Sequence, residues 1–442
     1  MPHTRQHDAS SAFTNSSFII FVLIIYLYIA LRLWHLGAYG LWLDEVFSVN
    51  VARLGWREII PFVAQDIVHP PLFYLLLKIW IGIGGETLFW LRLLPALTAI
   101  AAIVPLFLLC RDLRLTAVEI NTALLLIAVN SYLVYYAQEL RMYSLLLFFT
   151  LTSMWLFVRL INREDNSKKL LYALFIVNTL LIYTQYFGWF VVAVQFIYVF
   201  LWKRRRLFSF AIIGVASAVC FAPWVYLVSR AVAEKRGLSA NLGWLQRPRL
   251  SDLIWYYATL HGTIDVRRTT VLSLVIFGCP LLLWSWRVLK ARSEESKAHG
   301  TAFRLLILFS FVPVIFVFTV SRILPQSIWG ERYLIIAAVP YLILVAVAAC
   351  RWPSAQGRVI VTSLIIIWAA ASNLYALTRD NRKLHWDRLI HTLMQVEPTR
   401  ASGVKVYTFE EFAASPLRYS LESLGERRFD VAVIKDVIAV LG

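Results

Sequence analysis

Two adjacent acids, Asp44 and Glu45, directly follow the first hydrophobic segment of the chain. Charge is scarce in this protein, since only 16% of its 442 residues are Asp, Glu, Lys or Arg. A carboxylate at the end of an apolar helix can serve as a general base, and its neighbour can hold an acceptor or a metal ion. The alternative is that Asp44 caps a helix over residues 45–63, because Asp is a favoured N-cap.

A second group of reactive residue types follows further along the chain. Asp66 lies three residues before His69, which is followed by Pro70 and Pro71. The prolines predict the start of a helix, because proline suits a helix's first turn. His69 would then be held at the helix entrance, where the pair could position a sugar or a carboxylate. A lone loop histidine is more often structural, and that alternative stays open.

Three arginines lie at the ends of apolar segments, namely Arg92, Arg141 and Arg332. A guanidinium group matches the geometry of phosphate oxygens and stays charged when partly buried. For one such residue, anchoring at the membrane surface is the simpler explanation. For three on the same side as the acids, we favour an anion site.

Metal binding has only a weak signal. His261 and Asp265, four residues apart, could share one helical face and bind a divalent ion. The sequence has no glycine-rich phosphate loop, cysteine–histidine zinc spacing or nucleophile elbow. We therefore predict no certain cofactor, and a divalent metal remains possible.

The elements that must position these residues are membrane helices. Hydrophobic residues make up 60% of the chain, and the mean hydropathy is +0.68. Apolar runs of about twenty residues recur, which predicts an all-α polytopic membrane protein. Eleven spans are expected: 18–36, 88–110, 116–137, 142–161, 170–186, 188–202, 208–229, 270–288, 303–323, 333–350 and 358–378.

The net charge of +17 indicates basic loops and contact with anionic membrane lipids. Nucleic acid is not predicted as a partner, because no basic run carries stacking aromatics. With eleven spans, most basic loops share one side, which the positive-inside rule makes the cytoplasm. The acids and arginines then lie on the periplasmic or extracellular face of the cell membrane. The loop 230–268 is basic as well, although it is predicted on the outer side.

The first external loop, 37–87, contains an apolar run over 70–85 that is too short to span a bilayer. We predict that it forms an interfacial helix. After residue 378 the composition becomes polar. Residues 379–442 are predicted to form a small external α/β domain beside the membrane domain, 1–378, with helices over 386–395 and 410–424 and strands over 404–409 and 429–434.

These motifs, in this order, resemble the GT-C superfamily of membrane glycosyltransferases. The similar branch holds the protein O-mannosyltransferases, the lipid A aminoarabinose transferase and bacterial transferases that use polyprenyl-phosphate sugars (glycosyltransferase families 39 and 83). The resemblance rests on Leu43 to Glu45, Asp66 with His69 to Leu72, Arg92, the run from Gln138 to Tyr143, and Glu331 to Leu334. It covers roughly residues 17–350.

The resemblance implies transfer of a sugar from a polyprenyl-phosphate donor to a glycan, lipid or protein acceptor, with inversion. Asp44 would be the general base and Glu45 would help to hold the acceptor. Arg92, Arg141 and Arg332 would bind the lipid phosphate. The other substrate-binding residues would be Asp66, His69, Gln138, Tyr143 and Tyr333. A lipid-linked sugar flippase and a non-catalytic transferase-like subunit are the alternatives.

Overall fold

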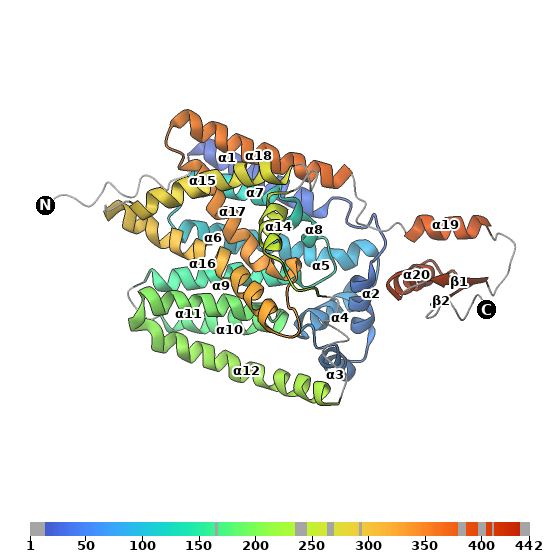
Figure 1. The fold of residues 1–442 in the computed structure, drawn as a ribbon. Helices are drawn as coiled ribbons and strands as arrows, with labels where there is room; N and C mark the ends of the chain where they lie inside the picture. Colours follow the sequence, from blue (N-terminus) through green and yellow to red (C-terminus); the bar gives the residue numbers. More distant parts are fainter. Residues whose placement is uncertain are drawn as a thin grey trace.

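The computed structural model describes residues 14–163, 167–234, 245–262, 269–290, 294–378, 386–396, 404–408 and 411–433. This part of the chain is mostly helical. Its long helices lie side by side, and α2, α3, α4 and the C-terminal segment gather at one end of the bundle (Figure 1). We call that end the site end, because Asp44 and its neighbours lie there.

Within the described residues, eight helical segments are long and apolar enough to cross a membrane. They comprise α1 (Asn15–Leu33), α5 with α6 (Leu88–Ala101, Ile103–Asp112), α9 (Tyr143–Ile161), η1 with α12 (Arg204–Arg206, Leu207–Ala233), α15 (Thr270–Lys290), α16 (Glu294–Ile323), η2 with α17 (Glu331–Leu334, Ile335–Cys350) and α18 (Ala355–Thr378). A ninth would be the pair α7 (Ala117–Ala128) and α8 (Ser131–Ala137), which is bent by 61°. The protein is therefore a multi-pass membrane protein.

The prediction of eleven spans is thus confirmed only in part. The predicted spans 170–186 and 188–202 form α10 (Lys168–Thr184) and α11 (Gly188–Trp202), which have 17 and 15 residues. At 1.5 Å per residue these helices are about 26 and 23 Å long, less than the roughly 30 Å hydrocarbon core. They lie alongside α9 and α12 (Figure 1).

A buried arginine stabilises the break between α7 and α8. The last carbonyls of a helix have no intrahelical donors. Arg32 of α1 supplies them, with Nη1 3.0 Å from the Ala128 oxygen and Nη2 3.1 Å from the Ile127 oxygen. Its guanidinium also stacks on Tyr28, 3.3 Å from the ring centroid. The break redirects the chain, so that the polar run after α8 reaches the site end.

Replacing Arg32 with Leu should lower the thermal stability of the protein in detergent. The buried carbonyls of Ala128 and Ile127 would lose their donors, and each unsatisfied buried group costs about 1–3 kcal/mol. The measurement is the unfolding midpoint, with Arg32→Lys beside it, which keeps the charge but loses the planar fork. An unchanged midpoint in Arg32→Leu would show that the break does not depend on this contact.

The first loop of the site end differs from its prediction. In place of one helix over 45–63, the chain forms α2 (Leu43–Arg53) and α3 (Trp56–Asp66). Asp44 lies inside the first turn of α2, and the N-cap position is Trp42. The proposal that Asp44 caps the helix is therefore wrong. The short helix expected over 70–85 is present as α4 (Leu72–Gly84).

The C-terminal segment contains the four predicted elements, namely α19 (Trp386–Val396), β1 (Val404–Thr408), α20 (Glu411–Ser423) and β2 (Phe429–Val433). The two strands pair in parallel, with Val404 opposite Phe429. Apolar side chains from both helices and β2 form a small separate core: Trp386, Ile390, Ala414, Leu417, Leu421, Phe429 and Val431.

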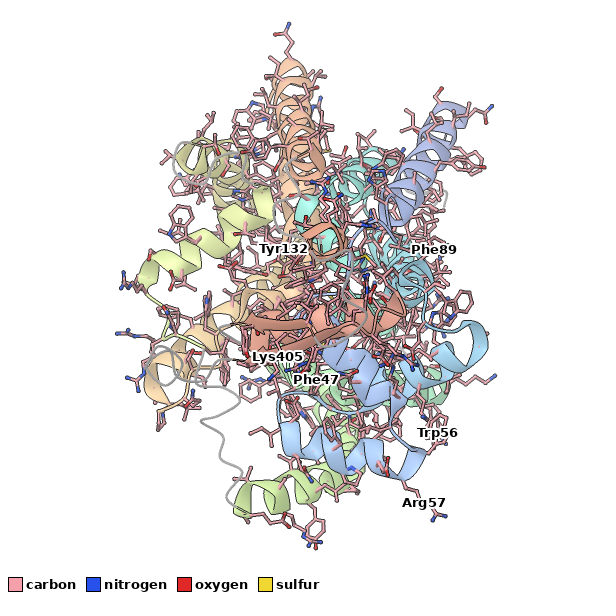
Figure 2. The ribbon with its side chains drawn as sticks, turned by 90° about the vertical axis from the view of Figure 1, so that its right-hand side faces the viewer. Phe47, Trp56, Arg57, Phe89, Tyr132 and Lys405 are labelled. Atoms are coloured by element: carbon pink, nitrogen blue, oxygen red, sulfur yellow. The ribbon has the colours of Figure 1, made fainter. Side chains whose placement is uncertain are left out.

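The C-terminal segment packs against the helix that carries the acids (Figure 2). Arg53 of α2 binds Glu86 at 2.7 Å and Glu422 of α20 at 3.3 Å. Trp386 lies directly over Gly40, where an added Cβ would come within 3.0 Å of the indole. The segment therefore covers α2 and the loop that precedes it.

Helix α14 (Leu250–His261) completes the described elements.

Candidate active site

Asp44 is the partly exposed acid of the pair. Its Oδ2 accepts a hydrogen bond from Arg332 Nη1 at 2.8 Å, and the two side chains are 24% and 19% exposed. The contact joins α2 to η2 across 288 positions of sequence. Position and access suit Asp44 for contact with a substrate hydroxyl group.

Arg141 is buried behind Asp44 and connects three elements. Its Nη1 donates to the Asp44 carbonyl at 3.1 Å, to Ser48 Oγ at 3.1 Å and to Tyr74 Oη at 3.3 Å. Its Nη2 lies 3.4 Å from both ring nitrogens of His69. Two guanidinium groups, those of Arg141 and Arg332, thus flank the first turn of α2.

His69 is neutral in this environment. It is 3% exposed, and burial together with the neighbouring Arg141 lowers its pKa to about 4. Its Nδ1 is 3.7 Å from Asp66 Oδ2. A neutral imidazole keeps one unprotonated nitrogen, which can accept a hydrogen bond from Arg141. His69 therefore helps to orient Arg141 without adding charge to the site.

Glu45 and Arg92 form a buried ion pair. Arg92 Nη2 and Nε reach the two oxygens of Glu45 at 2.7 and 2.9 Å, and both residues are at most 2% exposed. Arg92 also donates to the carbonyls of Tyr39 and Gly40, at 2.7 and 2.9 Å. Glu45 accepts a further bond from the amide of Leu140 at 2.9 Å. This arrangement fixes the loop before α2 and the run after α8.

Gln138 contacts backbone at the end of α1. Its Nε2 donates to the carbonyls of Leu31, Arg32 and Trp34 at 3.1, 3.3 and 2.8 Å. Tyr143 and Tyr333 lie deeper in the site, with ring centroids 6.3 Å apart. Tyr333 also stands edge-on to His69, at 6.0 Å. The two tyrosines form an aromatic wall beside the arginines.

One residue of the site was not predicted. Glu139 is 5% exposed, and neither of its carboxyl oxygens has a hydrogen-bond partner among the described residues. Burial, and then the nearby Glu45, raise its pKa to about 8. It lies within the run from Gln138 to Tyr143 on which the resemblance rests, but the sequence analysis gave it no role of its own.

The structure thus brings Asp44, His69, Arg141, Tyr143, Arg332 and Tyr333 together, with Asp66 beside His69. The metal hypothesis for His261 and Asp265 is not testable as a pair, because Asp265 lies outside the described residues. His261 itself is buried, with Nε2 2.7 Å from Tyr341 Oη and its ring stacked on Phe277. In the part of the chain that the structure describes, no three His, Cys, Asp or Glu side chains are grouped to hold a metal ion.

Comparison with known proteins gives a fold and no sequence family. No family model matches the chain, and no curated protein matches it. Among solved structures, ArnT from Cupriavidus metallidurans bound to undecaprenyl phosphate is similar over 97% of this chain and 88% of its own, with a TM-score of 0.60 and 13% identity. The apo form of that protein matches with a TM-score of 0.59.

A second similar structure is the oligosaccharyltransferase of Archaeoglobus fulgidus tethered to an acceptor peptide. It aligns over 94% of this chain and 64% of its own, with a TM-score of 0.52 and 14% identity. Both are GT-C membrane glycosyltransferases. The resemblance found in the sequence is therefore confirmed at the level of the fold, which is the GT-C fold.

Proposed function

We propose that this protein is a membrane glycosyltransferase that moves a sugar from a polyprenyl-phosphate donor to a glycan, lipid or protein acceptor. The observation that carries the proposal is a partly exposed carboxylate, Asp44, held beside the two guanidinium groups of Arg141 and Arg332. A base adjacent to an anion site is what transfer from a lipid phosphate requires. The similarity to a fold that holds undecaprenyl phosphate in ArnT supports the same donor class.

In the proposed reaction, Asp44 takes the proton of an acceptor hydroxyl as its oxygen attacks the anomeric carbon. The new bond joins the acceptor oxygen to that carbon with inversion. The bond from the carbon to the phosphate oxygen breaks, and the lipid phosphate leaves with the electron pair. Arg332 and Arg141 stabilise the charge that develops on the leaving group. Asp44 and the phosphate compete for Arg332, so donor binding frees the carboxylate to act as a base.

We further propose that the site faces the outside of the cell membrane. Helices that begin or end near the site carry basic residues at their opposite ends. Arg351, after α17, pairs with Glu119 at 2.6 Å, and its backbone carbonyl accepts a hydrogen bond from Arg287 at 3.0 Å. Arg206 binds the carbonyl of Leu160 at the end of α9. The positive-inside rule supports the cytoplasm for those ends.

The test is sugar transfer by the purified protein in liposomes, supplied with a panel of polyprenyl-phosphate monosaccharides and candidate acceptors. A glycosylated product with release of the polyprenyl phosphate would support the proposal. Movement of an intact donor across the bilayer without such a product would indicate the flippase alternative. Donor binding with neither product nor movement would indicate a non-catalytic subunit.

Arg332→Ala should weaken the binding of undecaprenyl phosphate by about tenfold to a hundredfold. Hydrogen bonds between a charged group and its ligand contribute about 1.5–3 kcal/mol, and every 1.4 kcal/mol is a factor of about ten. The affinity is measured by titration in detergent. The matched control is Arg57→Ala at the same end, because Arg57 is exposed and points away from the body (Figure 2). Equal losses in both variants would argue against a specific phosphate contact at Arg332.

A further inference from the structure

Glu139 is a buried acid for which the described part of the chain contains no ion-pair partner. It lies between the end of α8 at Ala137 and the start of α9 at Tyr143. Its side chain is sequestered from solvent, and neither carboxyl oxygen has a partner within the described residues. An ionised carboxylate without hydrogen bonds is costly to bury, so such groups tend to become protonated.

Charged and titratable groups from several elements face Glu139. Two acids on α2 oppose its ionisation, whereas arginines on its own loop and on η2 favour it. The groups involved are Asp44 and Glu45 of α2, Arg92 of α5, Tyr136 of α8, Arg141, Tyr143 of α9 and Arg332 of η2. Burial is the largest influence on the acid. Arg141 and Arg332, the two arginines that would hold a phosphate, therefore interact electrostatically with Glu139.

We propose that Glu139 is a further component of the anion site. Glu139 must be uncharged when a lipid-linked phosphate binds beside Arg141 and Arg332. The inference rests on the proposed function, because it takes the anion to be the phosphate of a polyprenyl donor. The neutral acid leaves the positive charge of the two arginines available to the phosphate. The ionised acid offsets part of that charge and repels the phosphate, so binding is coupled to uptake of a proton by Glu139.

The sign of the pH dependence follows from this coupling. Below the pKa of about 8, the empty site already holds the proton, and Glu139 does not alter affinity. Above it, binding must first protonate Glu139, so affinity falls by up to about tenfold for each pH unit. The fall ends at the higher pKa that Glu139 has beside the bound phosphate.

The experiment measures the affinity of the full-length protein for undecaprenyl phosphate between pH 6 and pH 10, in wild type and in Glu139→Gln. Glutamine keeps the size and the neutrality of the protonated acid but cannot titrate. The ratio of the two affinities cancels the titration of the lipid phosphate itself. We expect a ratio near one at neutral pH and a decline of wild type relative to Glu139→Gln above about pH 8. Glu234→Gln, an exposed acid, should follow wild type throughout.

A stability measurement gives an independent readout of the same proton. The pKa of Glu139 is raised in the folded protein, so its proton stabilises the fold at low pH. This stabilisation is lost as the pH rises from the usual carboxyl range toward 8. The unfolding midpoint of wild type should therefore fall relative to that of Glu139→Gln over this window.

The outcomes separate this inference from the proposed function. If wild type binds undecaprenyl phosphate and both proteins show parallel pH profiles, the role of Glu139 is overturned while the donor assignment stands. Loss of binding in Glu139→Gln at neutral pH would also overturn it, because the ionised form would then be required. If wild type fails to bind the lipid at any pH, the donor assignment itself is wrong and this inference falls with it.

Discussion

Replacing Asp44 with Asn should reduce the rate of sugar transfer by about two to four orders of magnitude, which is the usual contribution of a general base. Asparagine has nearly the same shape, and its Oδ1 can still accept the 2.8 Å hydrogen bond from Arg332. It cannot take the acceptor's proton. The ion pair is partly exposed, and such pairs contribute only about 0–1 kcal/mol to stability. The fold should therefore survive the change.

The rate is measured at saturating donor and acceptor, and binding of undecaprenyl phosphate is measured beside it. Binding should persist, because both arginines remain. The control is Asp112→Asn. Asp112 is the last residue of α6 and takes no part in the site; it accepts a hydrogen bond from Trp155 Nε1 at 3.1 Å. That variant should transfer sugar at the wild-type rate. Full activity in Asp44→Asn would remove Asp44 as the base.

That the candidate site residues lie close together could be predicted, because it follows from the membrane topology. Once the run over 70–85 is taken as too short to span a bilayer, the helix ends near Asp44, Arg141 and Arg332 fall on one side of the predicted membrane domain. The structure brings these three together through the Asp44 carboxylate and carbonyl. The C-terminal strands and helices were predictable as well, because polar and apolar residues alternate with the periods of those elements.

The number of spans was harder to predict, because length and hydropathy do not fix where a helix ends. The segment that forms α11 is apolar but has only 15 residues, and the one that forms α10 has 17, so neither is long enough to count among the candidate spans. The break between α7 and α8 depends on Arg32, which lies about a hundred residues earlier in the chain. A hydrogen-bond donor from such a distant part of the chain leaves no signal in the sequence around the break.

The partners of individual side chains were the least predictable feature. Glu45 follows Asp44 directly, yet on helical α2 the two side chains point in different directions. Asp44 meets Arg332 in a partly exposed position, whereas Glu45 turns inward to Arg92. Gln138 similarly turns to the end of α1. Residue type shows which chemistry is available, but the backbone direction decides whether a group faces substrate or protein.

Arg92→Met should destabilise the protein by about 3–5 kcal/mol, because it leaves Glu45 as a buried and unpaired charge. The two side chains are 3% and 2% exposed, so solvent cannot replace the lost partner. Arg92 also binds the carbonyls of Tyr39 and Gly40. Its loss should release the loop that leads into the first turn of α2. Thermal unfolding in detergent measures the loss of stability, and sugar transfer should fall with it as Asp44 loses its position.

The double variant Glu45→Gln with Arg92→Met separates a positioning role from substrate contact. Removing the stranded carboxylate should recover part of the lost stability, so the effects of the two single variants should not add. If the pair only positions the loop, Glu45→Gln alone should lower stability and kcat together. If Glu45 instead holds the acceptor, that variant should raise the acceptor KM while the unfolding midpoint stays unchanged. The buried, two-point contact between the carboxylate and the guanidinium favours the first result, in which the Glu45–Arg92 pair supports the base without touching the sugar.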